Sequence, residues 1–464
     1  MSEIKSVLFL GIGGISLSSL ALFLRAKGID VYGSDRNYGE KISVLTENGC
    51  DVNVGNNVVF DRNPDLVVYS GAISDSDPEL TYYRRAGYQC VERQIFLGEI
   101  SRQFKYTVAI AGTHGKTTVT SMLTHVFLHA NLNFYAHVGG DIKYPQDTPV
   151  DKNGKTGRIL SGNCVYTGDD YLLTEACEYR RSLLALRPHI GVVLNAETDH
   201  PDTYKNLTEI YDAFDVFLDL SRSRGLAITC GDTPYYRARR AHSDDITFGF
   251  LPHNRFTAKD VYEHKNGYFG FTICDFSNPI CKVELPIPGR HNVVNALAAA
   301  AVAATLKIDG DIIEAALESF PGVRRRFEKV SVFYGAKIFT DYAHHPSEIS
   351  VSISTAKSML GSGKRLFTVF QPHTYSRTEK LFKEFCACFE GSDEVLILKE
   401  YAARETSLMG KSASDLYEAI PLKKSYYENI IDIAAYLMQN ISPDDIVLIL
   451  GAGDIDNLSK LLKS

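Results

Sequence analysis

One short segment organises this chain: Ala111-Gly112-Thr113-His114-Gly115-Lys116-Thr117-Thr118. The apolar residues 106–111 before it indicate a buried strand, and residues 119–130 after it predict a helix. A glycine-bearing turn between a strand and a helix directs backbone N–H groups into one cavity, at the positive end of the helix dipole. Phosphate is the anion that suits such a cavity, with Lys116 as a charged donor and the Thr117 hydroxyl as a ligand for Mg²⁺. The segment therefore predicts binding of a nucleotide phosphate, although Ile110 reduces the full P-loop pattern to its shorter GTxGKT form.

The composition predicts a soluble, intracellular protein of several domains. The chain has 464 residues, too many for one ordinary core, and its hydrophobic and charged fractions of 45% and 23% are those of globular proteins. A net charge of -7 argues against a nucleic-acid binder that works through bulk charge. No apolar stretch reaches membrane-spanning length, and nine cysteines without metal-ligand spacing indicate free thiols in a reducing cytoplasm.

The first section of the chain, residues 1–105, has the parts of a Rossmann-like unit. A strand at 7–10 leads into Gly11-Ile12-Gly13-Gly14 and a helix, and a second strand ends at Asp35. A strand, a glycine turn, a helix and a later acidic residue are typical of dinucleotide-binding units. Ser16 occupies the third glycine position, so the fingerprint alone is weak. Close packing of the helix on the strand explains the same glycines without any ligand.

The second section, residues 106–320, begins with the phosphate loop. Two of its strands, 171–174 and 190–194, end in polar residues: Glu175 after the first, and Asn195, Glu197, Asp199 and His200 after the second. Because ligands collect at the carboxyl ends of parallel strands, we expect these side chains at the same sheet edge as the loop. Carboxylate and imidazole groups beside a polyphosphate are suitable ligands for Mg²⁺. Taken singly, Glu175 also suits a helix N-cap and His200 a buried turn.

The third section, residues 321–464, again alternates apolar runs with helix-like segments, as parallel α/β sheets do. Its apolar runs end in polar clusters at residues 341–345, 371–377, 399–401 and 451–454. Four such ends indicate one ligand-binding edge. The fold class is therefore α/β in three domains: a Rossmann-like N-terminal domain, a central domain with a mostly parallel P-loop-type sheet, and a Rossmann-like C-terminal domain. The residues alone predict an ATP-dependent enzyme and do not name its acceptor.

Several ordered motifs resemble those of the Mur ligases over essentially the whole chain. They are residues 112–118, Glu175 with 197–200, residues 289–296, residues 320–328 with 341–346, and residues 370–378. The last run is the most selective, and it resembles the L-alanine-adding branch rather than the tripeptide-recycling or later-adding ligases. After Glu175, where the family usually has a second acidic group and a Ser-Asp-Gly run, the chain reads Ala176-Cys177-Glu178-Tyr179-Arg180-Arg181-Ser182.

The resemblance implies an ATP-dependent, amide-bond-forming ligase of peptidoglycan precursor synthesis in the cytoplasm. ATP would phosphorylate the lactyl carboxylate of UDP-N-acetylmuramate, and the amine of L-alanine would attack the resulting acyl phosphate. Phosphorylation gives the carboxylate a leaving group, so the transfer needs positioning and charge neutralisation more than a protein nucleophile. ATP and Mg²⁺ are the implied cofactors, and neither nucleic acid nor a membrane is an implied partner.

The resemblance also implies a role for each matched residue. Residues 1–105 would bind the UDP-sugar, residues 106–320 would bind ATP, and residues 321–464 would add contacts to ATP and the amino acid. The implied catalytic residues are Lys116, Glu175, His200, Arg326 and Asp341, with Thr117, Glu175 and His200 as metal ligands. The implied ATP contacts are Gly112, Thr113, His114, Gly115, Lys116, Thr117, Thr118, His291, Asn292, Asn295, Arg326 and Asp341. The implied UDP-sugar contacts are Gly11, Gly13, Gly14, Asp35, Ser70 and Arg93, and those of L-alanine are His344 and Arg377.

Three alternatives remain open. The chain could be another Mur-type ligase that adds glycine or serine or recycles a peptide, although the run at 373–378 argues against recycling. The second alternative is a nucleotide-binding protein that has lost catalysis. Such a protein would be expected to have substitutions at the five implied catalytic residues, and all five are intact. An NAD-dependent oxidoreductase, suggested by the first glycine turn, leaves the phosphate loop and the C-terminal motifs unexplained.

Overall fold

The chain forms two compact units. A computed structural model describes residues 4–144, 158–200, 203–239, 244–403, 405 and 410–463. The first unit comprises residues 1–196, 208–257 and 296–317, and the second comprises residues 197–207, 258–295 and 318–464. Three mainly parallel sheets run through the described parts, so the predicted α/β fold class is confirmed.

The first unit opens with a five-stranded parallel sheet in the order β3–β2–β1–β4–β5. Its central strand β1 lies between β2 and β4, which places the turn after β1 where the strand order reverses, the usual ligand position in such sheets. The Rossmann-like prediction for this section is therefore confirmed. The elements are β1 (Ser6–Leu10), α1 (Ile15–Ala26), β2 (Asp30–Asp35), α2 (Glu40–Glu47), β3 (Asp51–Val54), β4 (Leu66–Tyr69), α3 (Pro78–Arg85), β5 (Cys90–Glu92) and α4 (Arg93–Ser101).

A second, larger sheet of the same unit carries the phosphate loop. Eight of its eleven strands run in the order β13–β12–β11–β6–β10–β7–β9–β8, the sheet continues beyond β13, and the strands from β13 to β7 are parallel. Strand β6 lies between β10 and β11, with Ile110 opposite Glu175 and Ala111 opposite Val193. The strands are β6 (Tyr106–Ala111), β7 (Phe134–His137), β8 (Arg158–Ser161), β9 (Cys164–Tyr166), β10 (Tyr171–Glu175), β11 (Ile190–Val193), β12 (Leu226–Cys230) and β13 (Ile246–Gly249). The helices are α5 (Lys116–His129), the 3₁₀ segment η1 (Tyr179–Ala185), α6 (Leu207–Arg222) and α7 (Pro234–Arg239).

The helix after the phosphate loop begins earlier than predicted. It starts at Lys116, whereas the apolar pattern predicted a start at residue 119. Gly115 is its N-cap and has a left-handed backbone, with φ 86°. Only glycine adopts this conformation without strain, so Gly115 ends the loop and the helix includes Lys116 and Thr117 from its first turn.

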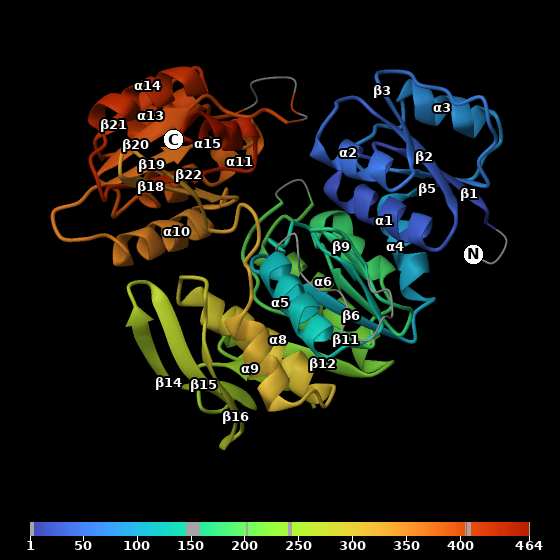
Figure 1. Cartoon of the computed structure of the whole chain (residues 1–464), viewed down its shortest axis with the longest axis horizontal. Coiled ribbons are helices and arrows are strands. Elements are labelled where there is room, and N and C mark those ends of the chain that lie inside the picture. The colour runs from blue at the N-terminus through green and yellow to red at the C-terminus, as the bar shows by residue number, and fades with distance from the viewer. Residues whose placement is uncertain are drawn as a thin grey trace. The chain divides into compact units, whose positions relative to one another are not determined.

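The second unit is built on a six-stranded sheet in the order β17–β18–β22–β19–β20–β21, in which only β17 runs antiparallel. Alternate strand residues pack on opposite faces: Leu448 belongs to the core with α10, α12 and α13, and Val447 to the core with α14 and α15. Figure 1 shows α10 and α14 on opposite sides of the strands. The strands are β17 (Glu328–Phe333), β18 (Ala336–Asp341), β19 (Leu366–Phe370), β20 (Glu394–Leu398), β21 (Lys424–Tyr427) and β22 (Ile446–Leu450). The helices are α10 (Pro346–Ser358), α11 (Tyr375–Lys380), α12 (Phe382–Ala387), α13 (Ala413–Ala419), α14 (Ile430–Asn440), the 3₁₀ segment η3 (Asp454–Asp456) and α15 (Asn457–Leu461).

A β hairpin and two helices complete the described fold. The predicted turn at Asn266-Gly267 is present between β14 (Phe256–Lys265) and β15 (Tyr268–Asp275), where Gly267 has φ 79°. Strand β16 (Asn278–Glu284) then pairs antiparallel with β15. The predicted alanine-rich helix is α8 (His291–Thr305), and α9 (Gly310–Glu318) follows it.

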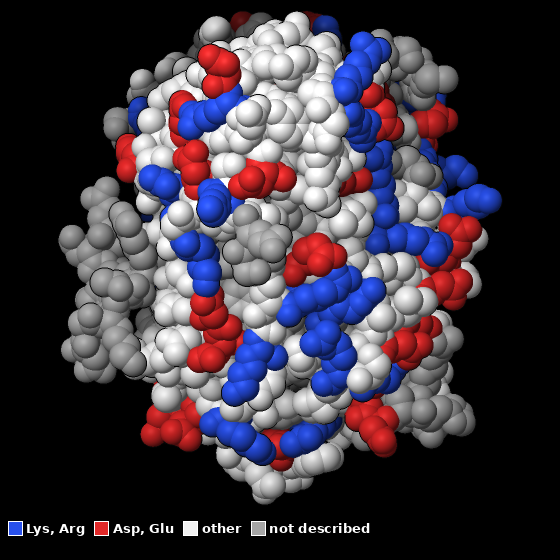
Figure 2. Space-filling view, turned by 90° about the vertical axis from the view of Figure 1, so that its right-hand side faces the viewer, with Lys and Arg blue, Asp and Glu red and all other residues white. Residues whose placement is uncertain are grey.

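The surface is mixed in charge. Figure 2 shows Lys and Arg side chains interspersed with Asp and Glu side chains over one face of the molecule. Within the described part of the chain, no helix combines the length and apolar character needed to cross a bilayer.

Candidate active site

The phosphate loop at the end of β6 is held by the end of β11. Gly112 has φ 139°, and a Cβ placed on it would lie 3.0 Å from the Leu194 Cβ and 3.2 Å from the backbone nitrogen of Asn195. The Asn195 side chain accepts a hydrogen bond from the His114 backbone nitrogen at 2.8 Å and donates one to the His114 carbonyl at 3.0 Å. Because both loop groups are tied to one amide, the loop backbone is fixed by the neighbouring strand. The sequence placed Asn195 at this edge but gave it no role.

Lys116 folds back onto its own loop. Its Nζ donates to the carbonyls of Gly112 and Thr113, the latter at 3.0 Å, and lies 2.9 Å from Oε2 of Glu178. Burial, the largest single cause, would lower the pKa of Lys116, but the charge and hydrogen bond of Glu178 together with the nearby Cys177 and Glu175 outweigh burial, and the pKa is raised. Lys116 is therefore a cation inside the loop. Glu178 is a partner that the sequence did not predict.

A hydroxyl and a carboxylate meet beside the loop. Thr117 Oγ1 donates to Oε2 of Glu175 at 3.2 Å, and the other carboxylate oxygen accepts from the Gly139 backbone nitrogen at 2.5 Å. A Cβ on Gly139 would lie 2.7 Å from that carboxylate, so only glycine allows this approach. The structure thus brings together Lys116, Thr117 and Glu175, as the strand order predicted. His200 belongs to the second unit.

The first glycine turn is held by the predicted acidic residue. Gly11 has φ 77°, and the Gly13 backbone nitrogen donates to Oδ2 of Asp35 at 2.9 Å. A Cβ on Gly13 would lie 2.9 Å from the same oxygen, so this glycine is required by close packing. A Cβ on Gly11 would lie 3.3 Å from the Ser70 Cβ, which places Ser70 beside the turn. Gly14 is the N-cap of α1 and leaves the helix start without a side-chain cap.

Ser16, at the start of α1, joins the first sheet to the second. Its Oγ lies 2.8 Å from Nε2 of His137 and accepts from Nη1 of Arg93 at 3.4 Å. The other His137 ring nitrogen lies 3.1 Å from the Thr174 hydroxyl, one residue before Glu175. Burial and the Arg93 charge lower the pKa of His137 to about 3, so the imidazole is neutral near neutral pH. Arg93 and Ser16 therefore lie together at the predicted UDP-sugar turn, with His137 as an unpredicted neighbour.

In the second unit, Asp341 ends β18 next to the ends of β22 and β19. Its Oδ2 accepts from the Ser352 hydroxyl at 2.7 Å and its Oδ1 from the Ala343 backbone nitrogen at 3.2 Å. Burial raises the pKa of Asp341 to about 6. Leu450 pairs with both Asp341 and Phe370, so the polar residues that follow β18, β22 and β19 start at the same edge of the sheet.

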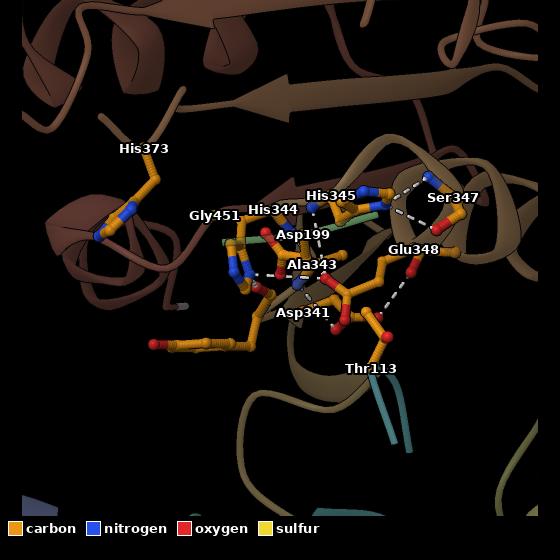
Figure 3. Close-up of polar contacts among 12 residues, drawn as sticks. Thr113, Asp199, Asp341, Ala343, His344, His345, Ser347, Glu348, His373 and Gly451 are labelled. Carbon is orange, nitrogen blue, oxygen red and sulfur yellow. Dashed lines mark hydrogen bonds and ion pairs between the residues drawn. The ribbon is translucent and has the colours of Figure 1, made fainter. Parts of the chain in front are cut away.

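The two histidines after Asp341 differ in their bonding (Figure 3). His344 Nδ1 lies 2.9 Å from the Tyr342 carbonyl, which accepts only, so Nδ1 carries the proton and Nε2 is left as an acceptor. His345 caps α10: its Nδ1 lies 2.8 Å from the Ser347 hydroxyl, and Glu348 completes the capping box. Burial, followed by the charge of Arg377, lowers the pKa of His344 to about 3. Of the two, His344 has a ring nitrogen suited to a ligand, and His345 is committed to the helix start.

Arg377 on α11 forms a buried pair with Asp199. Nη2 donates to Oδ1 of Asp199 at 3.0 Å, and both side chains are more than nine-tenths buried. Burial, the largest single cause, would raise the pKa of Asp199, but the Arg377 guanidinium, the two neighbouring histidines and a backbone hydrogen bond from His200 together hold the pKa well below its usual value. Arg377 Nε has no hydrogen-bond partner among the described residues. The sequence named Arg377 and placed Asp199 at a strand end, but it did not pair them.

Two of the arginines at 324–326, Arg325 and Arg326, make different contacts. Arg325 donates through Nη2 to the carbonyl of Gly451 at 2.7 Å and to that of Gly453 at 3.2 Å, so it holds the turn after β22. The guanidinium groups of Arg325 and Arg326 lie 5.1 and 5.2 Å from the centre of the Tyr342 ring. Arg326 thus lies beside the strand end that carries Asp341.

The start of α8 contains the last predicted group. The Asn292 side chain donates to the Pro288 carbonyl at 2.7 Å, and the Asn295 amide donates to the Asn292 side-chain oxygen at 2.9 Å. Gly289, with φ 100°, precedes the helix, and His291 is its first residue. These bonds hold the amide side chains of Asn292 and Asn295 in place at the helix start.

Three family profiles match consecutive parts of the chain. The Mur ligase family catalytic domain matches residues 6–105, the Mur ligase middle domain residues 110–303, and the Mur ligase glutamate ligase domain residues 325–453.

Individual relatives agree with these profiles. The UDP-N-acetylmuramate–L-alanine ligase of Clostridium acetobutylicum is 38% identical over 99% of this chain and 98% of its own length. The crystal structure of the UDP-N-acetylmuramate–alanine ligase MurC from Thermotoga maritima has a TM-score of 0.80 and 25% identity, over 98% of this chain and 97% of that one. A murein peptide ligase from Psychrobacter arcticus shares the fold, with a TM-score of 0.74 and 24% identity over 99% of this chain and 98% of that one. With three matching profiles and a relative similar along nearly its whole length, this chain belongs to the Mur ligase family.

Proposed function

We propose that this chain is a ligase that joins L-alanine to the lactyl carboxylate of UDP-N-acetylmuramate. The reaction consumes ATP, releases ADP and phosphate, and supplies a precursor of peptidoglycan. The observation that carries the proposal is the similarity, over 99% of the chain, to a ligase named for these two substrates. The phosphate loop provides the nucleotide chemistry that such a ligase needs.

Residues 112–118 are the proposed binding site of the ATP phosphates. The support is the loop geometry: Gly112 has no room for a side chain, and the Lys116 ammonium lies inside the loop. Backbone N–H groups at a helix start and a lysine are the donors that polyphosphate selects. His291, Asn292 and Asn295 are the proposed contacts on the base side of the nucleotide, Arg326 contacts the γ-phosphate, and Asp341 contacts the ribose.

Thr117, Glu175 and His200 are the proposed ligands of Mg²⁺. The Thr117 hydroxyl lies 3.2 Å from the Glu175 carboxylate, and such oxygen donors are those that Mg²⁺ prefers. When bound, the ion neutralises charge on the phosphate oxygens. Hydrogen bonds from Gly139 and Thr117 hold the Glu175 carboxylate in place.

The UDP-sugar is proposed to bind at the first glycine turn, through Gly11, Gly13, Gly14, Asp35, Ser70 and Arg93. The N-terminus of α1 lacks a side-chain cap, and Arg93 adds a positive charge within reach of Ser16. An uncapped helix start near a cation attracts diphosphate. This site and the phosphate loop are both parts of the first unit.

His344 and Arg377 are the proposed contacts of L-alanine. A neutral His344 with Nε2 as acceptor suits the amine, and the guanidinium of Arg377 suits the carboxylate. The lactyl carboxylate attacks the γ-phosphorus and ADP leaves. The amine then attacks the acyl phosphate, phosphate leaves, and the amine loses a proton. Each step depends on holding reactants in line and balancing charge.

The proposed division of labour has three parts: residues 1–105 for the UDP-sugar, residues 106–320 for ATP, and residues 321–464 for further contacts to ATP and the amino acid. The cytoplasm is the proposed location. All nine cysteines are free thiols, as expected of a reducing compartment.

The test is phosphate release from ATP and Mg²⁺ in the presence of UDP-N-acetylmuramate, with L-alanine, glycine and L-serine supplied in parallel. We expect phosphate release that depends on the amino acid, is fastest with L-alanine, and gives a product with the mass of UDP-N-acetylmuramoyl-alanine. Faster release with glycine or L-serine would identify another acceptor. Binding of ATP and UDP-sugar without phosphate release for any acceptor would contradict ligase activity.

A further inference from the structure

The ammonium group of Lys116 has all three of its protons in use. A lysine ammonium can donate three hydrogen bonds. In this structure the acceptors are the Gly112 carbonyl, the Thr113 carbonyl at 3.0 Å and Oε1 of the Glu178 carboxylate at 3.1 Å. A phosphate oxygen therefore gains a hydrogen bond from Lys116 only when one of these three acceptors gives way.

Glu178 is the one charged acceptor of the three. Its side chain is 3% exposed and that of Lys116 is 14% exposed, so water screens the pair weakly. A carboxylate in contact with the ammonium cancels much of the charge that would attract a nucleotide. The two carbonyls are neutral and carry no such effect. Glu178 therefore competes with the phosphates for the same cation.

The segment that carries Glu178 is fixed. The Arg181 backbone nitrogen donates to the Glu178 carbonyl at 2.8 Å, and the Leu183 nitrogen donates to the Cys177 carbonyl at 2.8 Å. On the α4 side, a Cβ on Gly98 would lie 2.5 Å from the Ala185 carbonyl, which shows that the helix and η1 are in close contact. On the preceding side, the Ala176 backbone nitrogen donates to the Ile110 carbonyl at 2.8 Å. Because these bonds hold the backbone before and after Glu178, the long flexible stem of Lys116 gives the lysine more freedom to move than the backbone at Glu178 has.

We propose that Glu178 is the resident counter-ion of Lys116, a positioning residue that holds the lysine on its loop and that the triphosphate of the nucleotide must displace. This inference rests on the proposed binding of ATP at residues 112–118. Glu178 acts through Lys116 and sets the affinity for the nucleotide. It gives a role to a residue that lies in the stretch where the chain departs from the usual Mur ligase pattern.

The test compares Glu178→Gln with the unchanged protein by calorimetric titration of ATP and ADP and by steady-state kinetics. Glutamine keeps the size and an acceptor oxygen but removes the charge. We expect the Kd and the KM of ATP to fall by about threefold to tenfold, the range for loss of one charge-assisted bond in competition. A purely structural role would instead raise the KM or leave it unchanged, and either result overturns the inference.

Two further variants make the outcome specific. Glu178→Asp keeps the charge and should not tighten ATP binding. In a Lys116→Met background, Glu178→Gln should no longer tighten ATP binding, because the cation it would release is absent. If Glu178→Gln still tightened ATP binding in the Lys116→Met background, the Glu178 carboxylate would be repelling the nucleotide directly. That result would overturn a role of Glu178 through Lys116. Absence of ATP binding to the unchanged protein would instead contradict the proposed function, so the two failures are distinguishable.

Discussion

The pair formed by Arg377 and Asp199 is a buried charged contact of the second unit. Replacing Arg377 by Ala removes the proposed partner of the amino-acid carboxylate and leaves the buried Asp199 carboxylate without its guanidinium partner. We expect the KM for L-alanine to rise roughly tenfold or more, the size of a lost charge-assisted bond, with a smaller change for ATP. Steady-state kinetics with each substrate varied in turn measure this. An unchanged KM for L-alanine would remove Arg377 from the amino-acid site.

The buried carboxyl of Asp341 gives a prediction about pH. Its pKa in the folded chain is about 6, above the ordinary value of 3.8, so the folded state binds a proton more tightly than the unfolded state between these values. Stability is therefore lost as the pH rises through this interval. Asp341→Asn mimics the protonated form and should stabilise the second unit by up to about 3 kcal/mol above pH 6 and by little near pH 4. Thermal unfolding of both proteins at the two pH values measures the difference. Equal stabilisation by Asp341→Asn at both pH values would contradict the raised pKa of Asp341.

The sequence alone predicted which residues lie at strand ends, but it did not predict which distant residues contact one another. Strand ends identified Glu175, Asn195 and Asp341 as edge residues, because the apolar runs are local and easily seen. The pairing of Lys116 with Glu178 joins residues 62 positions apart, and that of Arg377 with Asp199 joins residues 178 positions apart. Such contacts depend on sheet register and side-chain direction, which no local spacing encodes. For the same reason, the sequence did not predict the hydrogen bonds between the Asn195 side chain and the His114 backbone.

Among the elements, strand and helix types were predictable and their boundaries were less so. The start of α5 at Lys116 depends on a left-handed Gly115, a backbone property that the apolar pattern does not carry. The short strands β9 and β8 at one end of the second sheet were not predicted, because three or four residues give no clear alternation. The central parallel strands β6, β10 and β11 are uninterrupted apolar runs, so their positions were predicted correctly.

The turn between β1 and α1 gives a prediction at the scale of elements. In Gly13→Ala, the new methyl group would lie 2.9 Å from both the Asp35 carboxylate and the Ile42 side chain. Because β2 and α2 carry these two groups, the turn must move. We expect the Kd for UDP-N-acetylmuramate to rise by about tenfold with ATP affinity nearly unchanged, as for loss of one well-placed contact. Gly39→Ala is the matched control, since a Cβ there meets nothing within 4 Å. Equal effects of the two substitutions would contradict the role of this turn.

At the scale of the whole molecule, the proposed sites divide between the two units. The first glycine turn and residues 112–118 belong to the first unit, whereas residues 341–346 and 375–380 belong to the second. Two compact units need not unfold together, so a single unfolding midpoint does not describe the stability of such a chain. A ligand that binds only the folded state stabilises the part that holds it, by about 2.7 kcal/mol at a hundredfold excess over Kd.

This division predicts where each ligand protects the backbone from hydrogen exchange. UDP-N-acetylmuramate should slow exchange in peptides from residues 4–35 and leave those from residues 366–398 unchanged, because its proposed contacts all lie in the first unit. Lys116→Ala should abolish turnover and weaken, without abolishing, ATP-dependent protection of residues 106–129, yet keep UDP-sugar protection within a few-fold. Exchange followed by mass spectrometry, with and without each ligand, measures both effects. If the UDP-sugar protected mainly the second unit, or if Lys116→Ala weakened both ligands alike, the assignment of separate nucleotide and sugar sites would be wrong. Protection by ATP alone at residues 106–129 would instead show that the phosphate loop binds its ligand independently of the sugar.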